Sequence, residues 1–117
     1  MGDERFLRAH HISSTLDFQR AFRRRCSASD DRLLVFVWPN DQPHTRLGLY
    51  VSRKVGNAVV RNRWKRRIRE AFRLERPRLP VGVDLVVVPR GEAVAEVSAI
   101  RESLVRLAQR AVKRIRV

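Results

Sequence analysis

The stretch that decides the fold is Arg46–Arg73, which reads RLGLYVSRKVGNAVVRNRWKRRIREAFR. It begins with a short apolar run, Leu47–Ser52, that is typical of a β-strand. Gly56-Asn57 follows as a turn signal, because both residue types adopt positive φ at low cost. From Val59 onward the apolar residues recur every three or four positions, which is the period of an α-helix. The stretch therefore predicts a strand, a turn and a helix in succession.

The predicted helix separates apolar side chains from basic ones. At about 100° per residue, the residues on one face are Val60, Trp64, Ile68, Ala71 and Phe72. The residues on the opposite face are Asn62, Lys65, Arg66, Arg69 and Arg73, with Arg61, Arg63 and Arg67 along the borders. We expect the first face to pack on a core and the second to meet a partner.

The charge of this region indicates what that partner is. Residues Arg53–Arg78 hold eleven basic residues against two acids, Glu70 and Glu75. An ordinary solvated helix mixes both signs, whereas like charges at this density repel one another unless a polyanion neutralises them. Arginine outnumbers lysine here, and its planar guanidinium suits bidentate contact with phosphates. The helix is therefore predicted to bind nucleic acid.

The composition indicates what kind of protein this chain is. Its 117 residues suffice for one domain, 1–117, with one core. An apolar fraction of 44% favours a folded protein, and a net charge of +14 points to a polyanionic partner. No apolar run approaches the roughly 18 residues needed to span a bilayer, and residues 1–11, expected to be flexible, lack the apolar core of a signal peptide. The one cysteine, Cys26, suits a reducing compartment. We expect a cytoplasmic protein with no membrane partner.

The remaining patterns predict the other elements. A helix is expected over Ser14–Arg25, a short edge strand at Cys26–Ala28, a strand at Leu33–Trp38, a buried strand at Val83–Val88 and a long helix from about Ala95. The strands at Leu33–Trp38 and near Arg46 most simply pair as an antiparallel hairpin through the polar turn between them. The expected fold is thus an α/β (α+β) two-layer sandwich of one mixed sheet of about four strands with three helices, in the order α-β-β-β-α-β-α.

Charge and predicted fold are compatible with three functions. A ribosomal or other structural RNA-binding protein would explain the charge and the fold. A DNA-binding regulator would place the helix in a major groove, where Asn62 and Arg63 would read base edges, but no apolar seam suggests the dimer that such regulators commonly form. An independent nuclease would need a general acid and base. The three histidines, His10, His11 and His44, lie in expected loops, and the first two are adjacent, so no catalytic residues are expected.

The segment from Ser52 to Glu70 resembles the signature of the bacterial ribonuclease P protein subunit. The resemblance rests on a turn at Lys54–Ala58 followed by the Arg-Asn-Arg element at Arg61–Arg63. It implies that the chain binds the RNA subunit of ribonuclease P, through Arg53, Lys54, Asn57, Arg61, Asn62, Arg63, Lys65, Arg66 and Arg69. It also implies a left-handed β-α-β crossover between the third and fourth strands, which spacing alone could not indicate.

The same resemblance assigns a second RNA site. The pattern Asp17–Phe22 is similar to the family's first helix, whose aromatic residues help to line a cleft for the 5′ leader of precursor tRNA. Unpaired bases stack on aromatic faces while arginines hold the phosphates. The expected leader-binding residues are Phe18, Phe22, Tyr50 and Arg90. From the residues alone, Phe18 and Phe22, four apart on one face of the expected helix, could instead pack onto the sheet. Tyr50 lies on the first-helix side if the other two helices cover the opposite face, and Arg90 is a basic residue just after the fourth strand. In this family the RNA subunit performs catalysis with Mg²⁺. The resemblance therefore implies that the chain is an accessory subunit, and no metal ligand is assigned to it.

Overall fold

The computed structural model describes residues 26–91 and 93–115. The strands are β1 (Cys26–Ser29), β2 (Leu33–Pro39), β3 (Arg46–Leu49) and β4 (Val83–Pro89). The helices are α2 (Ala58–Glu75) and α3 (Val97–Ile115), with short 3₁₀ turns η3 (Arg53–Val55) and η4 (Arg76–Arg78). The predicted helix over Ser14–Arg25 lies outside these residues. Each of the other predicted elements is present within a few residues of its expected bounds.

The four strands form one mixed sheet in the order β1-β2-β4-β3. β4 pairs with β2 antiparallel and with β3 parallel, so it is the central strand that its valine-rich sequence predicts. β1 lies at the edge, as expected, and forms an antiparallel hairpin with β2. β3, α2 and β4 make a β-α-β unit, since the two strands are parallel neighbours; its left-handed crossover stays a prediction.

The predicted hairpin between β2 and β3 is wrong, because β4 lies between these strands. The connection from Asn40 to Thr45 crosses the start of β4 instead of making a tight turn. The backbone N–H of Asn40 donates to the carbonyl of Gly82 at 3.0 Å, and the Thr45 hydroxyl donates to the carbonyl of Pro80. The polar residues that suggested a hairpin turn therefore hold a loop against the segment that enters β4.

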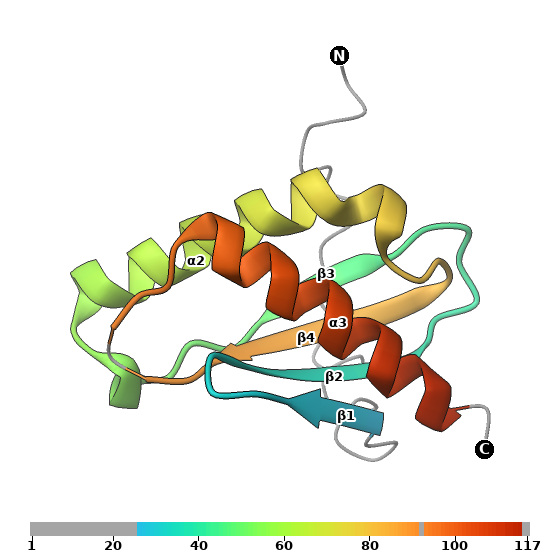
Figure 1. The fold of residues 1–117 in the computed structure, drawn as a ribbon, viewed down its shortest axis with the longest axis horizontal. Coiled ribbons are helices and arrows are strands. Elements are labelled where there is room, and N and C mark those ends of the chain that lie inside the picture. The colour runs from blue at the N-terminus through green and yellow to red at the C-terminus, as the bar shows by residue number, and fades with distance from the viewer. Residues whose placement is uncertain (1–25, 92, 116–117) are drawn as a thin grey trace.

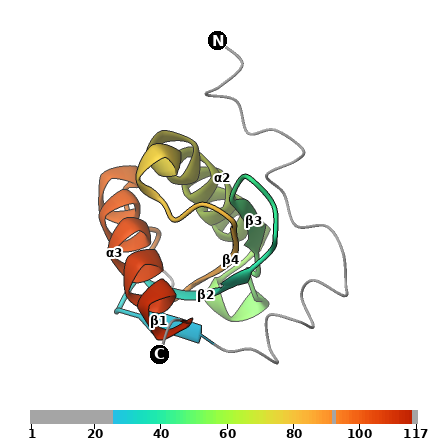
Figure 2. The same cartoon turned by 90° about the vertical axis from the view of Figure 1, so that its right-hand side faces the viewer.

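Both helices cover the same face of the sheet, as Figures 1 and 2 show. Because strand side chains alternate between faces, Val35, Val37 and Leu85 point towards the helices and are fully or almost fully buried. The residues that α2 and α3 contribute to this main core are Trp64, Ile68, Ala71, Phe72, Ile100, Leu104, Leu107, Ala108 and Ala111. All four of these α2 residues, and the α3 spacing, were predicted from the helical period.

The other face of the sheet carries a smaller apolar cluster. Its buried members are Phe36, Trp38 and Val86, and the half-buried Leu34 and Val88 pack against them. Phe36 and Val86 are partners in the antiparallel β2–β4 pairing. We call this set the second-face cluster. The sheet is therefore apolar on both sides.

A buried carboxylate ties three segments together on this second face. Asp84 is fully buried in β4 and accepts two hydrogen bonds from Arg46, from Nε at 2.7 Å and Nη2 at 2.6 Å. Arg46 is its cross-strand partner in β3. The Asn40 amide donates to the same carboxylate at 2.8 Å. A buried charge needs such pairing to offset its desolvation, so this network ties β4 to β3 and to the connection before it.

A second buried acid joins the end of α2 to α3. Glu75 accepts hydrogen bonds from Arg78 at 2.8 Å and from Arg101 at 2.5 Å, and its side chain is only 8% exposed. Burial alone would raise the pKa of Glu75, but the hydrogen bonds and positive charges of the two arginines outweigh burial and lower it below the ordinary 4.5.

This lowered pKa predicts a loss of stability in acid. A carboxyl whose pKa is lower in the folded state contributes stability that is complete above its unfolded pKa and is lost as the pH falls through the folded value. We therefore expect the free energy of unfolding to decrease below about pH 4.5. Glu75→Gln should flatten this dependence and cost about 1.5–3 kcal/mol at neutral pH, where hydrogen bonds to a charged group are lost.

This prediction is checked by measuring the urea midpoint of unfolding at a series of pH values between pH 3 and pH 7. Glu102→Gln is the control, since Glu102 is exposed and lies 3.7 Å from Arg106. It should keep the pH dependence of the unsubstituted protein. An equal flattening in both variants would show that Glu75 is not the group responsible.

Candidate nucleic-acid interface

Gly56 and Asn57 form the turn at which the helix α2 begins. The side chain of Asn57 caps the helix by accepting a hydrogen bond from the N–H of Val60 at 3.0 Å. Gly56 before it has φ of 144°, and a Cβ at this position would lie 2.9 Å from Cβ of Val60. Only glycine therefore fits here. The chain turns here as predicted, but only Gly56 has positive φ. Asn57, a predicted RNA contact, has φ of −74° and caps the helix instead.

The apolar face of α2 fixes the direction of its basic face. Trp64, Ile68 and Phe72 are completely buried against the sheet and α3. Arg63, Arg66 and Arg69 are exposed on the other side of the helix. Since the helix cannot rotate without exposing Trp64, these three side chains are directed away from the core.

Some of the basic residues on and beside α2 have partners within the protein. Arg73 pairs with Glu70, with Nη2 at 2.7 Å from Oε2, and Arg78 pairs with Glu75. Arg67 donates to the backbone carbonyl of Ala95 at 3.0 Å and lies 3.8 Å from Glu96. Arg67 thus ties α2 to the segment before α3.

The basic residues that were predicted to contact RNA differ from these. Within residues 26–91 and 93–115, no side-chain ion pair or hydrogen bond is made by Arg53, Lys54, Arg61, Arg63, Lys65, Arg66 or Arg69. The protein therefore pairs basic residues at the end of α2, whereas the seven cations before and along the helix have no partner among these residues. Arg61 differs from the other six because its Nε is buried.

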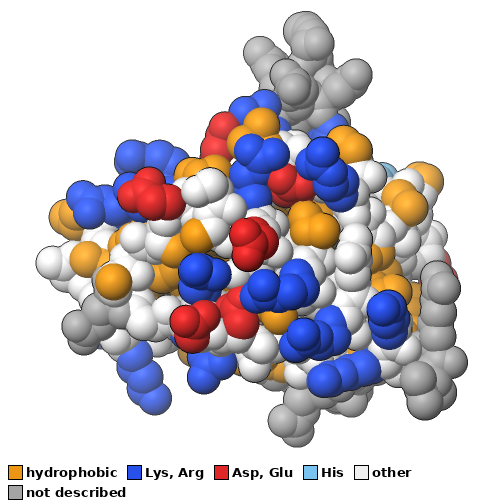
Figure 3. All heavy atoms as spheres, in the orientation of Figure 1, with side chains coloured by type: hydrophobic (Ala, Val, Ile, Leu, Met, Phe, Trp, Pro, Cys, Tyr) orange, Lys and Arg blue, Asp and Glu red, His pale blue; other side chains and the backbone are white. Residues whose placement is uncertain are grey.

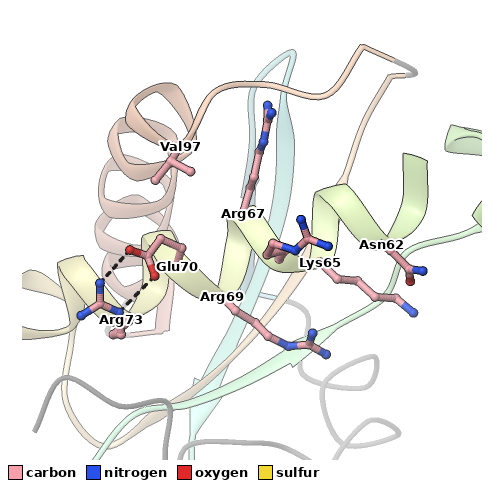
Figure 4. A pocket seen from close by; sticks show the side chains of 8 residues that line it. Asn62, Lys65, Arg67, Arg69, Glu70, Arg73 and Val97 are labelled. Atoms are coloured by element: carbon pink, nitrogen blue, oxygen red, sulfur yellow. Dashed lines mark hydrogen bonds and ion pairs between the residues drawn. The ribbon is translucent and has the colours of Figure 1, made fainter. Parts of the chain in front are cut away.

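A groove runs along this outer face. Its volume is ≈ 630 Å³, and the residues that line it are Asn62, Lys65, Arg66, Arg67, Arg69, Glu70, Arg73 and Val97. Figure 4 shows Lys65 and Arg69 extending away from the helix, while Arg67 points towards the segment before α3. The groove is lined mostly by donors and positive charge, which is the chemistry that holds phosphate.

The charges of α3 are arranged differently. Arg101 pairs with Glu75, and Arg106 pairs with Asp30 and lies near Glu102. Figure 3 shows acidic side chains interspersed with basic ones on the face that the two helices form. The basic surface with the fewest internal partners is therefore that of α2.

Two of the four predicted leader-binding residues lie within the described part of the chain, and Phe18 and Phe22 do not. Tyr50 is 55% exposed and follows β3, and its N–H donates to the carbonyl of Val87 at 3.1 Å. Its neighbours Leu49 and Val51 pack against the main core, so alternation places Tyr50 on the opposite, second face, as predicted.

Arg90 directly follows β4, as predicted, and it is exposed. Its backbone N–H donates to the carbonyl of Arg32 at 2.8 Å, and its Nη1 donates to the carbonyl of Asp30, also at 2.8 Å. Arg90 therefore lies against the turn between β1 and β2. The parallel strands β3 and β4 end at one edge of the sheet, so Tyr50, Arg90 and the start of α2 share that edge.

Sequence reasoning missed the aromatic side chains of the second face. Phe36 and Trp38 share this face with Tyr50, and both are almost fully buried. The alternation along Leu33–Trp38 contained the necessary signal, because it places residues 34, 36 and 38 on one side. Only the pairing of β2 with β4 shows which face of the sheet these residues share with Tyr50.

Metal and membrane chemistry receive no support from the described residues. Among residues 26–91 and 93–115, no three His, Cys, Asp or Glu side chains are grouped so that they could hold a metal ion. Within the same residues no helix has the length and apolar character needed to cross a bilayer.

Comparison with known proteins identifies relatives along most of the chain. The family model described as Ribonuclease P matches residues 6–112. The ribonuclease P protein component of Brevibacillus brevis is 40% identical over 106 residues, which cover 89% of this chain and 84% of the relative. The corresponding protein of Methylococcus capsulatus is 43% identical over 96 residues, covering 81% of this chain and 74% of the relative.

Solved structures show the same fold. The ribonuclease P protein of Thermotoga maritima matches with a TM-score of 0.77 and 32% identity, covering 86% of this chain and 96% of that protein. The Staphylococcus aureus ribonuclease P protein matches with a TM-score of 0.75 and 34% identity, covering 87% of this chain and 94% of that protein. The family match, the relatives and the shared fold agree with the signature at Ser52–Glu70, and this chain therefore belongs to the family of ribonuclease P protein components.

Proposed function

We propose that this chain binds the catalytic RNA subunit of ribonuclease P through the outer face of α2 and assists endonucleolytic removal of the 5′ leader from precursor tRNA. The observation that carries this proposal is the set of seven cations on and before α2 that have no partner within the described residues. Family membership supports the choice of RNA. A cytoplasmic location is part of the same proposal.

The physical role of α2 in this proposal is charge neutralisation. The RNA subunit and precursor tRNA are both polyanions and repel each other. Arginines held at fixed positions between them reduce this repulsion, and each neutralised phosphate releases condensed counterions. The chain needs no catalytic residue for this role. Hydrolysis, with Mg²⁺, belongs to the RNA subunit, and the protein binds and orients.

The leader of precursor tRNA is proposed to lie on the second face of the sheet. Tyr50 offers an exposed aromatic ring there, and Arg90 offers a cation at the same edge of the sheet. Phe18 and Phe22 remain predictions of the resemblance. A single strand would stack on the aromatic ring and place its phosphates near the arginine. Mature tRNA has no leader and would gain nothing from these contacts.

A cleavage assay tests the proposed function directly. Precursor tRNA is incubated at near-physiological salt and low Mg²⁺ with this protein, with a bacterial ribonuclease P RNA, or with both. We expect strong 5′ cleavage only in the mixture. Tight RNA binding without any gain in cleavage would favour a structural RNA-binding protein, and cleavage by the pure protein alone would require an active site in this chain.

The α2 surface can be tested by removing two of its exposed charges. The double variant Arg63→Ala/Arg66→Ala should weaken RNA-subunit binding by about tenfold or more at physiological salt, because two phosphate contacts are lost. The plot of log affinity against log salt concentration should flatten by about 2 units, at roughly 0.9 per contact. Filter binding between about 50 and 200 mM salt measures both.

The matched control is Arg110→Ala/Lys113→Ala, which removes two exposed cations from α3 instead. The net charge changes equally in the two variants, but the control should leave the salt dependence nearly unchanged. Equal effects of the two variants would mean that diffuse charge, and not the α2 surface, attracts the RNA.

Leader recognition can be tested at Tyr50. Tyr50→Ala should lower the affinity of the holoenzyme for precursor tRNA by about 5- to 100-fold, since stacking of one base contributes about 1–3 kcal/mol. Affinity for mature tRNA should not change. Tyr50→Phe keeps the ring and should keep the affinity. Equal losses for precursor and mature tRNA would place Tyr50 outside the leader site.

A further inference from the structure

The turn between β1 and β2 is built around one carboxylate, that of Asp30. Its Oδ1 accepts hydrogen bonds from the backbone N–H of Arg32 at 2.8 Å and from that of Leu33 at 2.9 Å. The backbone N–H of Asp30 donates to the carbonyl of Leu33 at 2.9 Å and closes the turn. The backbone of Asp30, including its carbonyl group, is therefore held in one orientation.

The helix α3 holds the same carboxylate from the other side. Arg106 donates to Oδ2 of Asp30. The buried hydroxyl of Ser103, one helical turn earlier, accepts a hydrogen bond from Nη1 of Arg32 in the same turn at 3.4 Å. The side chain of Asp30 is consequently only 15% exposed. These contacts join the turn rigidly to a helix that is packed in the main core.

Arg90 lies on this turn. Nη1 of Arg90 donates to the carbonyl of Asp30 at 2.8 Å, and its backbone N–H donates to the carbonyl of Arg32. A guanidinium has five N–H donors, and within residues 26–91 and 93–115 this is the one hydrogen bond that the side chain of Arg90 makes. Its other donors therefore stay available to an acceptor outside the protein, while one end of the group is fixed.

We propose that Asp30 is a positioning residue for leader recognition, which orients the guanidinium of Arg90 towards a phosphate of the bound single strand. The inference rests on the proposed function, in which Arg90 contacts the leader. Asp30 itself does not touch RNA. It acts by holding the carbonyl that fixes Arg90, so that less conformational entropy is lost when the phosphate binds.

The neighbouring residue provides a matched control. Asp31 occupies the same turn and carries the same charge, but it is exposed and makes no ion pair or side-chain hydrogen bond within the described part of the chain. A general electrostatic effect of a carboxylate near the leader would be relieved equally by removing either residue. A positioning role requires Asp30 alone.

The test uses the holoenzyme assembled with a bacterial ribonuclease P RNA, and it measures dissociation constants for a precursor tRNA and for mature tRNA. We expect Arg90→Ala to weaken precursor binding by about tenfold, the equivalent of one charge-assisted hydrogen bond, without affecting mature tRNA. Asp30→Ala should cause most of this loss, and Asp31→Ala should cause none. The double variant Asp30→Ala/Arg90→Ala should be no weaker than Arg90→Ala alone.

Asp30→Ala also removes the carboxylate oxygen that accepts hydrogen bonds from the backbone N–H groups of Arg32 and Leu33. Arg106→Ala therefore serves as a second variant. It releases the carboxylate from α3 and leaves the turn intact, and we expect a loss of about threefold for precursor tRNA that disappears in the Arg90→Ala background. Losses that add to that of Arg90→Ala, or that affect both tRNAs equally, would overturn the positioning role.

The outcomes separate this inference from the proposed function. If Arg90→Ala weakens precursor binding and neither Asp30→Ala nor Arg106→Ala does, leader recognition stands and the positioning role fails. If the unsubstituted holoenzyme binds precursor and mature tRNA equally well, the proposed leader site itself is wrong.

Discussion

The fold depends on the pairing of β3 with β4, and the ion pair between Arg46 and Asp84 fixes the register of that pairing. Asp84 is fully buried within an otherwise apolar strand, where an unpaired carboxylate would cost several kcal/mol. A shift of β3 by one residue would move Arg46 to the other face of the sheet and leave this charge alone. Asn40 donates to the same carboxylate, so the connection that precedes β3 is held by it as well.

The parallel pairing has a functional consequence. Parallel strands end at the same edge of a sheet, and the chain leaves β3 for α2 and leaves β4 for Arg90 at that edge. The proposed contacts to the RNA subunit, along α2, and to the leader, at Tyr50 and Arg90, thus begin within one region. The helix then carries one set of contacts away from this edge, and the second face of the sheet carries the other.

The local patterns of the sequence were sufficient for much of this structure. Helical periodicity placed Trp64, Ile68 and Phe72 in the core and the α2 cations outside, because both depend only on residues within a few turns. Strand alternation likewise placed Tyr50 on the second face. Membership of the family was indicated by the Arg61–Arg63 element and the turn before it, because residues at this fixed spacing are more specific than a basic helix alone.

Contacts between distant segments could not be predicted in this way. β2 and β3 looked like a hairpin because they are neighbours in sequence, whereas the strand that separates them comes about forty residues later. Helical periodicity placed Arg67 at the border of the basic face but could not indicate that its side chain reaches the carbonyl of Ala95. The contact between Arg90 and Asp30 spans sixty residues. Each depends on tertiary packing, for which a single sequence carries no local signal.

The two tryptophans of the chain give the molecule a pair of internal optical reporters. Trp64 lies on the buried side of α2, and Trp38 lies on the opposite face of the sheet, and each is almost completely shielded from water. Within residues 26–91 and 93–115 the indole N–H of Trp64 has no hydrogen-bond partner, so the ring is in an apolar environment that favours short-wavelength emission. The two rings lie on opposite faces of the sheet, so their fluorescence reports on the burial of both faces without any added label.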